Sequence, residues 1–261
     1  MFYGLLRHCR LPRGLSALLA SCVLLLGLGL APAALAADVD GGVEGADPQD
    51  PQLTSLIPFD TAGQSGNRVT LISGSLTGSV YGGVAASGND NAVFGNTATM
   101  KAGGSVDHGV VGGWSEGNGD VYNNSAVIEG GSVGTGVYGG LINNAASAGN
   151  VYGNTVTVLG GTLGSDTYID TVSGGSTAGS GDVYDNTAIV SGGDIKGQVR
   201  GGYSASGDVY GNSVFVDGAA KVDNNVYGGY ADAGAAWGNS VPVDGTASVG
   251  DSVYGGASLG N

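Results

Sequence analysis

The sequence has little of the side-chain chemistry on which many enzymes depend. It has two cysteines, Cys9 and Cys22, and two histidines, His8 and His108. Both cysteines lie in an apolar amino-terminal segment, so the rest of the chain can form no disulfide and has no thiol chemistry. His108 is then the one remaining histidine, without the partners of a His-based metal site or a catalytic triad. We expect His108 to be structural or solvent-exposed.

Charged residues are also scarce, and basic ones most of all. They make up 11% of the chain, with 8 basic and 22 acidic residues and a formal net charge of −14. Outside the first 36 residues, five basic residues face all 22 acidic ones, which gives −17. Such a surface repels nucleic acid and anionic lipid. We therefore expect no nucleic-acid partner.

The first 36 residues have the pattern of a secretory signal peptide. Arg7, Arg10 and Arg13 give a positive start, residues 15–30 are nearly all apolar, and Ala34-Leu35-Ala36 forms an A-x-A site. We expect cleavage before Ala37 and an exported protein. Two alternatives are an uncleaved anchor, for which the apolar run is short, and a lipoprotein signal at Cys22, which the apolar run continues past.

Residues 37–66 form a transition segment. Its first part is acidic and interrupted by Pro48 and Pro51, which predicts a flexible leader. The run 53–59, LTSLIPF, is more apolar. We expect it to cover the open end of the solenoid that follows, because a solenoid needs a cap on its terminal face.

From residue 67 onward the sequence repeats. An Asn followed by alternating apolar residues recurs seven times, at spacings of 29, 28, 30, 32, 26 and 27 residues. Period-two alternation predicts strands, and self-similarity at 20 to 50 residues predicts a solenoid or array. A chain with 54 glycines and few charges can also be disordered, but here 41% of the residues are hydrophobic and they occupy fixed repeat positions. The seven anchors are Asn67, Asn96, Asn124, Asn154, Asn186, Asn212 and Asn239.

Each repeat predicts three or four short strands separated by glycine turns. In the fourth repeat Val156 and Val158 point one way, Leu163 begins a second apolar segment, and a phrase ending in Gly-Gly follows, as in Val137-Tyr138-Gly139-Gly140. We predict an all-β fold: a parallel β-helix of about seven coils spanning residues 67–261. Stacked ~4.8 Å apart, seven coils give a rod ~35 Å long, with inward Val ladders and an Asn ladder at a turn. A β-propeller is the alternative, but its blades need about 40 residues.

The phrases at 149–164, 181–197 and 207–218, together with the VYGG phrases, resemble the passenger repeats of bacterial autotransporters, the type V secreted proteins. The resemblance covers about residues 67–261. It implies a right-handed parallel β-helix displayed on the outer membrane of a Gram-negative bacterium and followed by a β-barrel translocator. Residues 1–261 contain no barrel-like alternating strands. We expect either that the chain is a fragment of a longer reading frame or that its anchor lies elsewhere.

Carboxylates and tyrosines are the candidates for a site. Asp182 and Asp208 occupy equivalent places in adjacent repeats, as does Asp120, with Asn150 interrupting the series; Asp217 and Asp244 form a second pair. Such pairs could share a cation or raise one another's pKa, but we expect turn-capping Asp residues that bond their own backbone two residues on. The tyrosines should form outward rows that stiffen the sheets or grip a ligand. These are Tyr81, Tyr138, Tyr227 and Tyr254, and Tyr122, Tyr152, Tyr184 and Tyr210.

Taken together, these patterns favour a non-enzymatic, surface-exposed or secreted protein that acts as a stalk or an adhesin. We expect no catalytic, cofactor-binding or metal-binding residue. The expected partner is a host surface protein, a glycan or another cell. The alternative is a carbohydrate-active β-helix enzyme, a lyase or hydrolase, which would need basic residues near an acidic cluster. The basic residues available are Arg68, Lys101, Lys196, Arg200 and Lys221.

Overall fold

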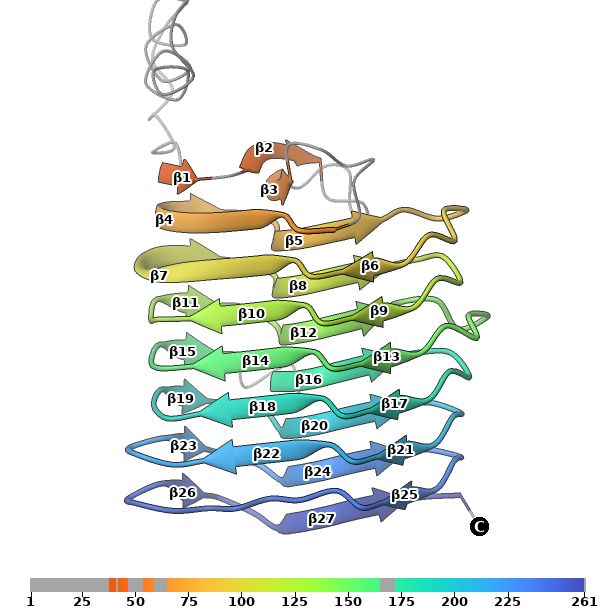
Figure 1. Cartoon of the computed structure of the whole chain (residues 1–261). Coiled ribbons are helices and arrows are strands. Elements are labelled where there is room, and N and C mark those ends of the chain that lie inside the picture. Colours follow the sequence, from red (N-terminus) through yellow and green to blue (C-terminus); the bar gives the residue numbers. More distant parts are fainter. Residues whose placement is uncertain (1–37, 41, 47–53, 59–64, 165–171, 261) are drawn as a thin grey trace, which may run out of the picture. The chain divides into compact units, whose positions relative to one another are not determined.

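The computed structural model describes residues 38–40, 42–46, 54–58, 65–164 and 172–260 (Figure 1). The chain divides into two units, Met1–Ala36 and Ala37–Asn261, and all the described residues belong to the second. The expected signal peptide and its cleavage site lie outside the described residues. The second unit is a stack of parallel coils (Figure 1). The predicted all-β parallel solenoid of about seven coils is confirmed, and the described residues contain no helix.

A typical coil has four strands that belong to three sheets. Its first strand is a two-residue member of a six-stranded sheet and ends in an aromatic residue. These strands are β6 (Val93–Phe94), β9 (Val121–Tyr122), β13 (Val151–Tyr152), β17 (Val183–Tyr184), β21 (Val209–Tyr210) and β25 (Ala236–Trp237).

The repeated Asn follows this strand, and the chain then enters a twelve-stranded sheet. In the first two coils one long strand continues round a corner; in later coils a glycine turn divides it in two. The long strands are β4 (Arg68–Leu76) and β7 (Thr97–Val106). The pairs are β10 (Ser125–Ile128) and β11 (Ser132–Val133), β14 (Thr155–Val158) and β15 (Thr162–Leu163), β18 (Thr187–Val190) and β19 (Asp194–Ile195), and β22 (Ser213–Val216) and β23 (Lys221–Val222), with β26 (Ser248–Val249) in the last coil.

The coil closes with a six-residue strand in a nine-stranded sheet, and every such strand begins with Val-x-Gly-Gly, where x is Tyr in four of the seven coils. Equivalent residues pair between neighbouring coils throughout, as Val137 does with Val110 and Val172. This register stacks like residues on like. The strands are β5 (Val80–Ala85), β8 (Val110–Ser115), β12 (Val137–Ile142), β16 (Val172–Thr177), β20 (Val199–Ser204), β24 (Val226–Ala231) and β27 (Val253–Ser258).

The predicted inward ladders form the core. The residues two and four places after each Asn are buried in the first six coils, as are the inward-facing apolar residues of the two later strands. Val216 is 1% exposed, whereas Phe215 points outward. The last coil differs: Val243 is 43% exposed, and isolated bridges replace the strand there. Pro242, beside Val243, has no N–H to contribute to the ladder.

The Asn ladder is confirmed, and it runs unbroken through all seven coils. Each side-chain amide donates to the side-chain oxygen of the next Asn at 2.9–3.0 Å, and that oxygen also accepts the backbone N–H of the first Asn. In Asn154 the amide also donates to the carbonyls of Val121 and Tyr152. A buried amide with this many partners fixes the turn at which it lies.

Glycine is required at both positions of the Gly-Gly pair because the backbone of the nine-stranded sheet passes close to the ladder Asn and to the backbone beside it. A Cβ on Gly139 would lie 2.5 Å from the carbonyl oxygen of Gly174, and one on Gly140 would lie 2.6 Å from the side chain of Asn154. Both glycines therefore face the interior, where the nine-stranded sheet touches the Asn ladder. Any side chain there would have to displace backbone or the ladder itself.

The transition segment contains strands, which differs from the flexible leader expected for its acidic part. Strand β1 (Asp38–Asp40) runs antiparallel to β4, and β2 (Gly42–Ala46) runs antiparallel to β3 (Thr54–Pro58). Strand β3 pairs in turn with β5, and Leu56 is fully buried in the main core. These strands lie against the first coil (Figure 1), where they pair sheet edges that would otherwise be open.

Candidate functional site

One outward surface carries a continuous row of stacked aromatic rings on the six-stranded sheet. Neighbouring ring centroids are 4.6–5.1 Å apart, and their planes differ by 2–6°. The four tyrosines of this row were predicted, but the rings at its two ends were not. All six occupy the position two residues before the repeated Asn, which is the signal that would have identified them. The row is Phe94, Tyr122, Tyr152, Tyr184, Tyr210 and Trp237.

In the inner part of this row, the neighbouring rings cover both faces of each aromatic ring. A ring between two parallel rings at about 5 Å presents only its edge and its hydroxyl to solvent. Sugar recognition by aromatic side chains uses the ring face. The geometry therefore favours the stiffening role for this row, since same-face neighbours stabilise a sheet surface.

The carboxylates beside this row are engaged with backbone. Asp120 accepts the backbone N–H of Asn150, Asn150 accepts that of Asp182, and Asp182 accepts that of Asp208, at 2.8–2.9 Å. Each side chain thus bonds the next coil, which corrects the expectation of a bond to its own backbone two residues on. Asn150 serves as well as Asp because the bond needs only an acceptor oxygen.

These carboxylates also act on the nearby phenol groups. Burial raises the pKa of Tyr210, and the negative charges of Asp182, Asp185 and Asp208 raise it further. The second predicted pair, Asp217 and Asp244, comes from equivalent positions, and Asp244 bonds the N–H of Gly245. Within the described ranges, no group of three or more His, Cys, Asp or Glu residues is arranged to hold a metal ion.

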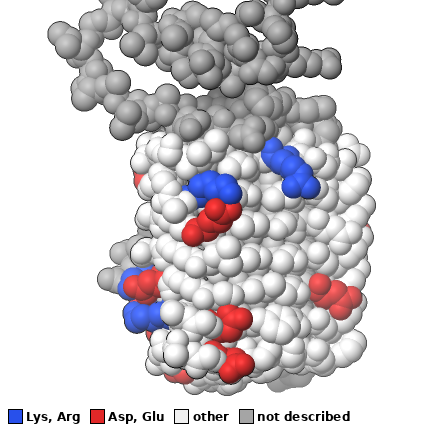
Figure 2. All heavy atoms as spheres, turned by 60° about the vertical axis from the view of Figure 1, so that its left-hand side comes forward, with Lys and Arg blue, Asp and Glu red and all other residues white. Residues whose placement is uncertain are grey.

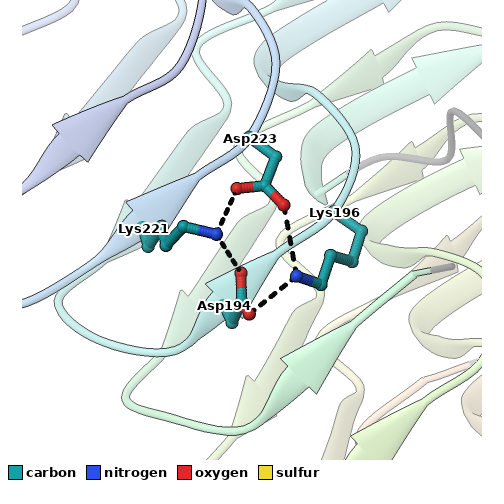
Figure 3. Close-up of polar contacts among 4 residues, drawn as sticks. All are labelled: Asp194, Lys196, Lys221 and Asp223. Carbon is teal, nitrogen blue, oxygen red and sulfur yellow. Dashed lines mark hydrogen bonds and ion pairs between the residues drawn. The ribbon is translucent and has the colours of Figure 1, made fainter. Parts of the chain in front are cut away.

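Basic residues are mostly bound in ion pairs with acidic neighbours. Lys101 pairs with Glu129 of the next coil. Farther along, Asp194, Lys196, Lys221 and Asp223 form a closed ring across two coils (Figure 3), with the Lys196 contacts at 2.8 and 3.2 Å. In Figure 2 the few charges on this side stand among uncharged residues.

This ring of charges joins adjacent coils at their corner. The hydrogen bond from Lys196 lowers the pKa of Asp194, and the one from Lys221 lowers that of Asp223. All four side chains are partly exposed, so their energetic contribution is modest and sensitive to salt. The arrangement links the two coils through side chains as well as through their strands.

The outer face of the nine-stranded sheet does not follow the predicted outward row of tyrosines. Tyr81 is 2% exposed and lies tilted against Trp114, in a cluster with Val84 and Val111. Tyr81 thus lies on the outer face in a cluster separate from the main core, but the expectation that it belongs to an exposed, stacked row is wrong. Tyr227 and Tyr254 of the last two coils do stack as predicted, with ring centroids 5.1 Å apart and planes that differ by 9°. Val, Ser or Arg stands in the row in three of the earlier coils, so no continuous stack forms. The row reads Tyr81, Val111, Tyr138, Ser173, Arg200, Tyr227 and Tyr254.

In the fifth and sixth coils this face carries a cluster unlike any other among the described residues. The guanidinium of Arg200 lies 4.9 Å from the ring centroid of Tyr203 and 5.0 Å from that of Tyr230. Its Nε and Nη2 donate to the side-chain oxygen of Gln198. The hydroxyl of Tyr203 donates to Asp232 at 2.6 Å. Burial, together with this bond and the charge of Asp232, raises the pKa of Tyr203 to about 12.

Comparison of the chain with models of known families gave no match, and comparisons with curated proteins and with solved structures gave none either. Within the described part of the chain, no helix has the length and apolar character needed to cross a membrane.

Proposed function

We propose that this protein is a non-enzymatic, autotransporter-like passenger: an exported β-solenoid that serves as a stalk or adhesin at the surface of a Gram-negative bacterium. The observation that supports it most is the unbroken continuity of two ladders, the buried Asn ladder and the outward aromatic row, through the stack. Continuous ladders produce a stiff, extended body. A protein that holds a contact away from a cell surface needs such a body.

Continuity of this kind also argues against a catalytic centre as the main purpose of the chain. Asp120, Asp182 and Asp208 hold backbone N–H groups of the next coil, and the lysines are held in ion pairs. A lyase or hydrolase would need an acid and a base that converge on one substrate bond. The partners proposed are a glycan or a host surface protein, with an outer-membrane translocator for display.

The test expresses the full chain with its own amino terminus in a Gram-negative host, fused at its carboxyl end to an outer-membrane β-barrel translocator. We expect a mature protein that begins at Ala37, is cleaved by protease added to intact cells, and increases attachment of those cells to a glycan-coated or host-cell surface. Retention inside the cell would contradict the surface assignment. Release of sugar from polysaccharides incubated with the purified protein would replace the stalk or adhesin with the enzyme.

A further inference from the structure

The geometry points to a binding site for a carboxylate-bearing sugar on the outer face of the nine-stranded sheet, formed by Arg200, Tyr203, Tyr230 and Asp232. The inference rests on the proposed adhesive function and names the ligand class that it would use.

The first support is that charged and amide side chains interrupt the pattern of the neighbouring coils at this place. Gln198, Arg200 and Asp232 stand at positions that carry other residues in the neighbouring coils, and the fold brings them together with the equivalent pair Tyr203 and Tyr230 across two coils. The ladders need none of these residues. An arginine in a row otherwise made of Tyr, Val and Ser loses part of its hydration, and it takes no part in the Asn ladder or the aromatic row of the six-stranded sheet. A unique cluster in a repetitive surface is suited to recognition rather than to stiffening.

The second support is that the Arg200 guanidinium is held in one orientation and still has N–H donors to offer. Two tyrosine rings hold it by cation–π contacts, and Gln198 fixes its rotation through two N–H groups. Arginine has five N–H donors, so three remain on Nη1 and Nη2. Among the described residues, no Asp or Glu forms an ion pair with Arg200. A planar, oriented fork of this kind binds a carboxylate with two parallel hydrogen bonds.

The third support is the arrangement of the other groups. The ring centroids of Tyr203 and Tyr230 are 6.0 Å apart with planes at 18°, a wider spacing than the 4.6–5.1 Å on the six-stranded sheet, and Tyr227 meets Tyr230 edge-on at 64°. Tyr203 and Tyr230 are both partly exposed. Asp232 receives the Tyr203 hydroxyl on Oδ2, and its carboxylate has further acceptor capacity for a sugar hydroxyl. A ring surface, a carboxylate-binding cation and a hydroxyl acceptor together match an acidic sugar.

A carboxylate-bearing sugar could be a uronic acid or a sialic acid, and the probes distinguish the two. The purified mature chain is titrated with trigalacturonate and with sialyllactose, and in parallel with methyl-esterified trigalacturonate and lactose, which lack the charge. We expect saturable binding of at least one acidic probe and at least tenfold weaker binding of its neutral counterpart. Binding of the neutral probes at equal strength would overturn the carboxylate assignment.

Variants then place the site. Arg200→Gln should weaken binding of the acidic probe by about tenfold or more, and Arg200→Lys should restore only part of it, because Lys lacks the planar fork. Lys101→Gln removes the same charge from another face and should leave binding unchanged. Unchanged thermal unfolding of each variant shows that the fold is retained. Equal binding by wild type and Arg200→Gln, or no saturable binding of either acid by the folded wild type, overturns the inference.

These outcomes stay separate from those of the proposed function. If the purified chain binds neither acid while cells that display it still attach to host surfaces, the inference fails and the adhesive function stands. If the chain is not exposed on intact cells, the proposed function fails whatever the sugar titration gives.

Discussion

Asn154 donates its side-chain amide to the side-chain oxygen of Asn186 over 2.9 Å, although 32 residues separate them along the chain. The same oxygen accepts the backbone N–H of Asn154 at 3.0 Å. One buried side chain therefore satisfies two donors of the preceding coil. Because an Asn stands at this place in every coil, the stack is held in register by a chain of side-chain amides as well as by its strands.

Replacing a ladder Asn should destabilise the protein strongly. Asn154→Ala leaves the backbone N–H of Asn124 without its acceptor in a buried place, and it removes one of the three acceptors of the Asn124 side-chain amide. We expect a loss of about 2–4 kcal/mol in the free energy of unfolding, measured by denaturant titration. Asn118→Ala is the control, because Asn118 is exposed and bonds Asp90 at the surface; it should cost under about 0.5 kcal/mol. Equal losses would show that the ladder does not hold the stack.

The core register gives a second test. Val216→Asp places an unpaired charge in the fully buried ladder and should cost about 3–5 kcal/mol or prevent folding. Ser213 lies in the same strand on the outer side, next to Ser240, so Ser213→Asp should cost little. Circular dichroism during thermal unfolding measures both. Similar losses of stability in the two variants would contradict the assignment of Val216 to the inner face and of Ser213 to the outer face.

The Gly-Gly phrase predicts a contrast between coils. In Gly140→Ala the new methyl group would overlap the Asn154 side chain, and we expect a loss of about 1–3 kcal/mol from the strain. Gly255 lies in the same phrase of the last coil, and a Cβ there would first meet the Asn239 carbonyl oxygen at 3.4 Å. Gly255→Ala should therefore be tolerated. The measurement is the melting temperature of each variant. A Gly140→Ala variant as stable as the wild type would contradict the close approach of Gly140 to the Asn154 side chain.

The raised pKa of Tyr203 predicts a loss of stability at high pH. Its pKa is about 12 in the folded protein and 10.0 as the ordinary value, so the folded state keeps a proton that the unfolded state loses between these values. Stability should be unaffected by this group below pH 10 and should fall from pH 10 to about pH 12. Absorbance of tyrosinate should show a step near pH 12 that Tyr203→Phe removes. A titration that is complete by pH 10.5 would contradict the bond to Asp232.

The sequence predicted the features that recur at a fixed offset in every repeat and missed those that do not. It found Asn212, Val214 and Val216 because a ladder repeats at a fixed offset. It missed Phe94 and Trp237 because the aromatic row conserves ring shape rather than residue type. It misplaced Tyr81 because alternation gives a side chain's direction but not what covers it. The Arg200 cluster, formed by Arg200, Tyr203, Tyr230 and Asp232, combines three different repeat positions from two coils, and a search for equivalent positions cannot find it.

Whole-coil deletions test the proposed stalk and its contacts together. Deleting residues 186–211 joins Asp185 to Asn212, and deleting residues 124–153 joins Asn123 to Asn154. Asn123 and Asp185 have φ of 54°, and the glycines they replace, Gly153 and Gly211, have φ of 63° and 66°, so each junction preserves the turn. Both shortened proteins should fold, remain displayed and lose ~4.8 Å of length.

Their binding should differ, because only the deletion of 186–211 removes Arg200 and Tyr203. Attachment through the Arg200 cluster should then disappear in that protein and persist in the one lacking 124–153. Contacts spread evenly along the rod would instead weaken attachment by a similar degree in both, because avidity falls with the number of sites. Measuring cell attachment and polysaccharide cleavage for the full and the two shortened proteins separates these cases. Cleavage by the full protein that is lost entirely on deletion of 186–211 would favour an enzyme that uses Asp182 and Asp208, since that deletion alone removes Asp208.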